Sequence, residues 1–129
     1  MNTFVIRVDS SSIIGTGHVI RCLTLAEHLR QYGSEVHFIC RAHPGHIGDI
    51  ISTKGFNISL LSEPMKLSRT LPPKEDYSIW LGVSQEEDAD QTISVLNLER
   101  PDWLIVDHYD LDILWEKNLK PYVKKIMVI

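Results

Sequence analysis

The chain has 129 residues, of which 43% are hydrophobic and 23% are charged, and its formal net charge is -4 at pH 7. These values are typical of one globular domain and exclude an intrinsically disordered chain. There is no basic stripe for nucleic acid, and no stretch resembles a secretory signal or a membrane span. We therefore expect a cytoplasmic protein with neither nucleic acid nor membrane among its partners.

The first half of the chain alternates between strand and helix patterns. Residues 3–8 predict a strand, and apolar residues at helical spacing from Val19 to about Tyr32 predict a helix that ends at Gly33. Shorter elements follow, and they are a strand over 35–40, a helix over 46–54 and a strand over 56–61. This βαβαβ order requires parallel strands that are joined by right-handed crossovers.

Residues 62–81 interrupt this alternation. The segment contains several prolines and mixed charge, which predict an irregular stretch. Ser84 with Glu87 three residues later forms a capping box, which predicts a helix over residues 85–98.

The last part of the chain returns to alternating elements. Residues 103–106 (WLIV) predict a strand buried inside a parallel sheet, Asp110 is expected to cap a helix that ends at Pro121, and residues 123–129 begin a further strand. The whole pattern predicts an α/β fold, a Rossmann-like parallel sheet with helices on both faces and the strand order 3-2-1-4-5. Because the last strand lacks a covering helix, we expect a piece of a longer protein.

Ligands of open parallel sheets bind beyond the carboxyl ends of the strands, so two loops are of interest. Residues 9–18 follow the first strand, and residues 107–110 follow the strand expected beside it. Gly15 and Gly17 allow close approach of a ligand, and the helix after them directs N–H groups and partial positive charge at it. The dinucleotide fingerprint lacks its third glycine and its ribose-binding acid, so no cofactor is expected.

His18 stands in the first turn of the predicted helix, where the positive helix end disfavours a protonated imidazole. A neutral imidazole can accept a proton from water, which makes His18 a candidate general base. The alternative is a turn residue that bonds to backbone. Asp9 could orient His18, bind a hydroxyl group or satisfy loop N–H groups, and Arg21 could bind an anionic substrate or be a solvated helix residue.

Several other polar residues carry weaker expectations. His43 and His46 have no further ligand at a recognisable interval, so no metal is expected. Cys22 and Cys40 form no disulfide pattern and are expected to be reduced core residues.

The serines and aromatic residues near the predicted loops have two readings each. The serines at positions 10–12 lie outside any G-x-S-x-G elbow, so acyl transfer is not expected and bonding to loop backbone is favoured. Tyr77 and Trp80 could stack on a sugar or uracil ring or fasten their segment to the core, and fastening is the favoured interpretation.

Three segments together resemble a known family. They are RVDSSSIIGTGHVIRCLTLAEHL at residues 7–29, WLGVSQEEDADQT at 80–92 and WLIVDHYDLD at 103–112. The first follows a pattern R-x-D-x-S-x-x-I-G-x-G-H-x-x-R, met here by Arg7, Asp9, Ser11, Ile14, Gly15, Gly17, His18 and Arg21. It resembles the PseG family, the UDP-2,4-diacetamido-2,4,6-trideoxy-β-L-altropyranose hydrolases of pseudaminic acid biosynthesis. A shorter G-x-G-H also occurs in glycosyltransferases similar to MurG.

The resemblance implies the amino-terminal domain of a GT-B-like two-domain enzyme, whose carboxy-terminal domain, absent from this sequence, holds most of the nucleotide. It implies metal-free hydrolysis of the bond between the anomeric carbon and UDP, with His18 activating water, and inactivity of these 129 residues alone. The residues expected to bind substrate are Asp9, Gly15, Gly17, Arg21, His108 and Tyr109. Two alternatives stay open, a GT-B glycosyltransferase that uses a nucleotide-sugar donor and a non-catalytic domain that binds a sugar nucleotide.

Overall fold

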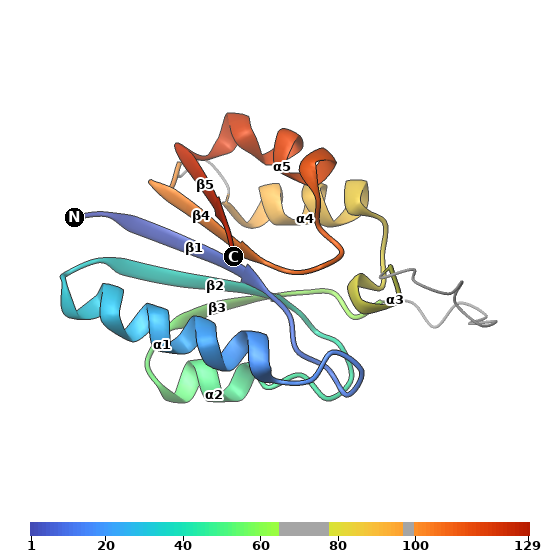
Figure 1. The fold of residues 1–129 in the computed structure, drawn as a ribbon, viewed down its shortest axis with the longest axis horizontal. Coiled ribbons are helices and arrows are strands. Elements are labelled where there is room, and N and C mark those ends of the chain that lie inside the picture. Colours follow the sequence, from blue (N-terminus) through green and yellow to red (C-terminus); the bar gives the residue numbers. More distant parts are fainter. Residues whose placement is uncertain (65–77, 97–99) are drawn as a thin grey trace.

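A parallel sheet of five strands forms the centre of the computed structural model, which describes residues 1–64, 78–96 and 100–129 (Figure 1). The strands are β1 (Thr3–Val8), β2 (Glu35–Arg41), β3 (Asn57–Leu61), β4 (Trp103–Asp107) and β5 (Lys125–Val128). Their order is β3-β2-β1-β4-β5, and every neighbouring pair is parallel. The predicted Rossmann-like sheet and its strand order are confirmed.

Helices cover both faces of the sheet, as the sequence predicts. One face carries α1 (Gly17–Gln31) and α2 (Gly48–Thr53), and the other carries α4 (Gln85–Leu96) and α5 (Ile113–Leu119) (Figure 1). A short helix, α3 (Ser78–Leu81), precedes α4, and a 3-10 turn, η1 (Lys120–Tyr122), follows α5. No helix within the described ranges is long and apolar enough to cross a bilayer.

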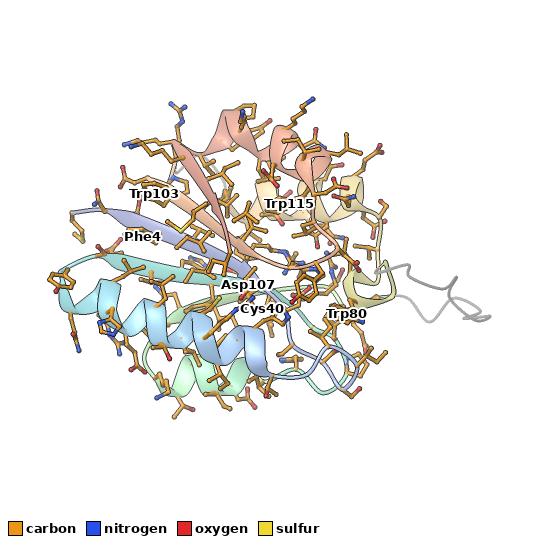
Figure 2. The ribbon with its side chains drawn as sticks, viewed as in Figure 1. Phe4, Cys40, Trp80, Trp103, Asp107 and Trp115 are labelled. Carbon is orange, nitrogen blue, oxygen red and sulfur yellow. The ribbon has the colours of Figure 1, made fainter. Side chains whose placement is uncertain are left out.

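Each face of the sheet has its own apolar core because successive strand residues point to opposite sides. On β1, Phe4, Ile6 and Val8 pack toward α1 and α2, whereas Val5 belongs to the core under α4 and α5. On that second side Trp115 of α5 is fully buried against the sheet (Figure 2). The same alternation decides where the polar residues at the strand ends point.

The element boundaries differ from the sequence expectation in four places. Helix α1 begins at Gly17 rather than Val19, α2 is shorter than residues 46–54, and β5 is shorter than residues 123–129. The segment 62–81, expected to be irregular, contains α3 at its end.

Asp112 rather than Asp110 caps α5, so the predicted cap is wrong. The Asp112 carboxylate accepts a hydrogen bond from the Leu114 N–H at 2.9 Å. Asp110 instead accepts the Leu81 N–H at 2.8 Å and thereby ties α3 to the loop after β4. Pro121 lies inside the 3-10 turn that continues from α5, since a proline without an N–H is tolerated in a first turn.

Candidate functional site

Asp107 ends β4 and points toward α1. It shares one face of the strand with Trp103 and Ile105, and Ile105 belongs to the core under α1. The residue pairs with Val8 of β1 across the parallel ladder, so it lies next to the point where β1 leaves the sheet for α1. Figure 2 shows Asp107 away from the end of the sheet at which Phe4 and Trp103 stack.

The first two turns of α1 present His18 and Arg21 to this carboxylate. The His18 Nδ1 lies 2.7 Å from one Asp107 oxygen, and the Arg21 Nε donates to the other at 2.7 Å. The Arg21 Nη2 also donates to the Asp107 oxygen that His18 contacts, and the Cys22 thiol donates to the carboxylate at 3.4 Å. The His18 side chain is 14% exposed and the Arg21 side chain is 50% exposed. The ring is thus held while the guanidinium keeps access to solvent.

These contacts assign the tautomer of His18. Burial would raise the pKa of Asp107, but the hydrogen bonds from Arg21 and His18 outweigh burial and hold this pKa below its usual range. An ionised Asp107 accepts hydrogen bonds only, so a neutral His18 carries its proton on Nδ1. The lone pair of a neutral ring is then on Nε2, which has no hydrogen-bond partner among the described residues.

His18 lines a small pocket at the carboxyl edge of the sheet. Its other lining residues are Asp9, Ile14, Trp80, Asp107, His108 and Tyr109. The Tyr109 ring stands edge-on to His18, with 5.1 Å between centroids, and Trp80 packs against Tyr109 at 5.4 Å. Tyr109 also lines a wider surface groove between the starts of α4 and α5. The candidate base therefore faces a pocket with one aromatic side.

The two loop glycines differ in what requires them. Gly15 has a φ of 85°, which favours glycine, and its N–H donates to the Ser11 carbonyl. Gly17 has no such backbone strain, and an added Cβ would meet no protein atom within 4 Å. Space is therefore open in front of the first turn of α1, where a ligand is expected.

Asp9 lies beneath the pocket, fully buried, in a network with Arg7 and two histidines. Its carboxylate accepts hydrogen bonds from the Arg7 guanidinium, from the Arg41 N–H at 2.7 Å, from His108 at 3.0 Å and from His43 at 3.2 Å. Burial would raise the pKa of Asp9, but the Arg7 charge and the histidine hydrogen bonds lower it well below its usual value. His18 is therefore contacted by Asp107 and not by Asp9, and Asp9 takes the structural role left open above.

His108 fastens the loop after β4 to this buried carboxylate. Its Nε2 contacts Asp9, and its Nδ1 accepts the Asp110 N–H at 3.0 Å. Both ring nitrogens are thus used inside the protein, which limits its predicted role in substrate binding to shaping the pocket. Tyr109, the next residue, is 60% exposed and lies between His18 and Trp80.

Asp88 of α4 completes the buried network on the far side of the sheet. Arg7 and Arg41 point to that side, and both guanidinium groups contact the Asp88 carboxylate. The Trp115 Nε1 donates to it at 2.9 Å, and the Thr92 hydroxyl donates at 3.3 Å. Burial would raise the pKa of Asp88, but the two arginines outweigh it and lower this pKa. The network joins α4 and α5 to the central strands.

Acidification is expected to unfold the protein through these carboxylates. The pKa values of Asp9, Asp88 and Asp107 are lower in the folded state than in the unfolded chain, so the unfolded state binds more protons as pH falls. Their stabilisation is complete above the ordinary carboxyl pKa of about 4 and is lost as pH falls through the lowered values. Urea unfolding should give a smaller free energy of unfolding at about pH 3 than at about pH 5. Equal values would contradict this account.

The remaining polar candidates are satisfied within the protein. The Ser11 hydroxyl accepts the N–H groups of Ile13 and Ile14, and the Ser10 hydroxyl accepts that of Ile47, as expected for serines that bond loop backbone. His46 accepts the Gly48 N–H. Tyr77 lies outside the described residues.

No group of three or more His, Cys, Asp or Glu side chains in the described ranges is arranged to hold a metal ion. Cys22 and Cys40 are buried free thiols, and burial raises the pKa of both. No protein-family model matches the chain, and a search of curated proteins found no match.

Proposed function

We propose that this domain belongs to an enzyme that hydrolyses a UDP-activated 2,4-diacetamido-2,4,6-trideoxy sugar to the free sugar and UDP. His18 is the general base. A water oxygen attacks the anomeric carbon, the water proton passes to His18 Nε2, and the bond from that carbon to the diphosphate oxygen breaks with its electrons leaving on UDP. The chemistry requires neither metal nor cofactor.

One observation carries the proposal, the short contact between His18 Nδ1 and Asp107 beside a pocket. A histidine whose Nδ1 proton is bound by a carboxylate keeps its Nε2 lone pair for proton transfer and is held in one orientation. Such a histidine–carboxylate pair recurs in enzymes that activate water or a hydroxyl group. The PseG-like motif around His18 supplies the substrate class.

Arg21 fits the leaving group in this proposal. Asp107 fixes its Nε and Nη2, and half of the side chain stays exposed next to His18. A fixed guanidinium near the base attracts a diphosphate and stabilises the negative charge that develops on its oxygen. The uridine, in this proposal, is held by a second domain with the GT-B arrangement, and efficient hydrolysis by the 129 residues alone would contradict that part.

Product analysis of the complete enzyme tests the reaction. Incubation with the UDP-sugar and no acceptor is expected to release UDP and free sugar in equal amounts, since water is the only acceptor. Release that depends on an added hydroxyl acceptor would instead indicate a glycosyltransferase. Binding of the UDP-sugar without turnover under either condition would indicate a non-catalytic domain.

Replacing Asp107 by asparagine is expected to lower kcat by about 10- to 1,000-fold, with a smaller change in KM. The amide presents an N–H or an uncharged oxygen to His18, so the Nδ1 proton is no longer stabilised and Nε2 is no longer reliably the proton acceptor. Steady-state kinetics against pH check the change. A kcat profile identical to that of the wild type would show that Asp107 does not position the base.

A further inference from the structure

The pocket beside His18 has one apolar side whose role the hydrolysis reaction itself does not explain. Trp80 of α3 and Tyr109 of the loop after β4 come from distant parts of the chain, and their rings pack at 5.4 Å with a tilt of 36°. Both line the pocket together with Ile14. We call Trp80 and Tyr109 the aromatic wall.

The protein fixes the aromatic wall from several directions. Leu81, next to Trp80, is buried in the core under α4 and α5, and its N–H is bound by Asp110. Gly82 follows with a φ of 79°, and an added Cβ there would lie 2.4 Å from the Pro64 ring. On the other side, His108 anchors Tyr109 through its contact with Asp9. The wall is therefore built into the fold and not placed by chance.

Its surface is nevertheless left open. Tyr109 is 60% exposed, and Trp80 is partly exposed and belongs to neither core. Pockets for small ligands combine aromatic sides with a few oriented polar groups, and this pocket has that composition. The wall thus has the properties of a ligand surface and not those of a fastening into the core, which was the favoured interpretation of Trp80.

The polar atoms of the pocket floor favour an apolar ligand face against the wall. The Asp9 carboxylate already binds Arg7, His43 and His108, and Asp107 already binds His18 and Arg21. Hydroxyl groups directed at this side would compete with these bonds. Carbon-bound hydrogens and methyl groups pack on aromatic rings without that cost.

We propose that the aromatic wall binds the apolar face of the sugar ring that carries the scissile bond, including its deoxygenated carbon and acetamido methyl groups. This inference rests on the proposed function, because the anomeric carbon must lie within reach of His18, whose ring centroid is 5.1 Å from that of Tyr109. The ring that carries this carbon is then the part of the substrate nearest the wall. The uracil is separated from it by ribose and two phosphate groups.

Kinetics of the complete enzyme test the wall with three variants. Tyr109→Ala is expected to raise KM for the UDP-sugar about tenfold, with a smaller change in kcat, because ring contact in the ground state is lost. Tyr109→Phe keeps the ring and should keep KM. Tyr32→Ala removes a tyrosine that is 86% exposed at the end of α1 and is the matched control. An unchanged KM in Tyr109→Ala, or an equal rise in Tyr109→Phe, would overturn the proposal.

Ligand-detected NMR gives a second readout that does not depend on turnover. Saturation transfer from the protein to the free 2,4-diacetamido-2,4,6-trideoxy sugar should be strongest at its methyl protons and should weaken in Tyr109→Ala but not in Tyr32→Ala. Transfer that Tyr109→Ala removes from the uracil protons of UDP instead would assign the wall to the base. If the wild type binds the sugar in this way but releases none from UDP-sugar, the hydrolase proposal fails while the wall stands.

Discussion

Replacing His18 by asparagine in the complete enzyme is expected to lower kcat by about 100- to 10,000-fold, the usual contribution of a general base. Asparagine can keep a hydrogen bond to Asp107 but has no lone pair of suitable basicity to accept the water proton. KM should change little, because the aromatic wall and Arg21 remain. Release of UDP measured over a substrate series separates the two constants.

The control for this variant is His28→Asn. His28 lies in the last turn of the same helix, is exposed, and is at the opposite end of α1 from the pocket. Both variants should give the wild-type circular dichroism spectrum and melting temperature. Wild-type kcat in His18→Asn would remove the base assignment and favour a structural role for the loop.

The largest effect on stability is expected from Asp88→Asn, at about 3–5 kcal/mol of the free energy of unfolding. The substitution removes the carboxylate that Arg7 and Arg41 share and leaves two buried guanidinium groups with less compensating charge. It also weakens the bonds from Trp115 and Thr92. A loss of this size is a large part of the total stability of a domain. Urea unfolding followed by tryptophan fluorescence measures it.

Asp90→Asn supplies the matched comparison on the same helix. Asp90 is exposed, so its substitution should change the free energy of unfolding by less than about 0.5 kcal/mol. If both variants lose equally little, the buried network does not stabilise the fold, and the three carboxylates would not explain acid unfolding either.

The architecture could be predicted because its signals are local. Apolar strands of five to seven residues, helical spacing and glycine at the end of α1 are each contained in a short window, and the rule for parallel crossovers does the rest. The buried ion network could not be predicted in this way. Arg7 meets Asp88 across 81 positions of sequence, and no local pattern distinguishes these two charges from solvated ones.

The candidate site was found in part for the same reason. His18 stands next to two glycines at a helix start, which is a local signal, whereas Asp107 was passed over in favour of His108 and Tyr109. Alternation along β4 contained the missing information, since Trp103, Ile105 and Asp107 share the face that α1 covers. Combined with the predicted strand order, it places Asp107 beside the first turn of α1.

The pairing of Val8 with Asp107 across adjacent strands has a consequence for engineering and divergence. The backbone ladder, and not the connecting loops, determines how far the imidazole lies from its carboxylate partner. Connections elsewhere can therefore lengthen or shorten among descendants without disturbing that distance. A single residue inserted into β4, by contrast, would turn the carboxylate toward the opposite helices and separate the pair in one step.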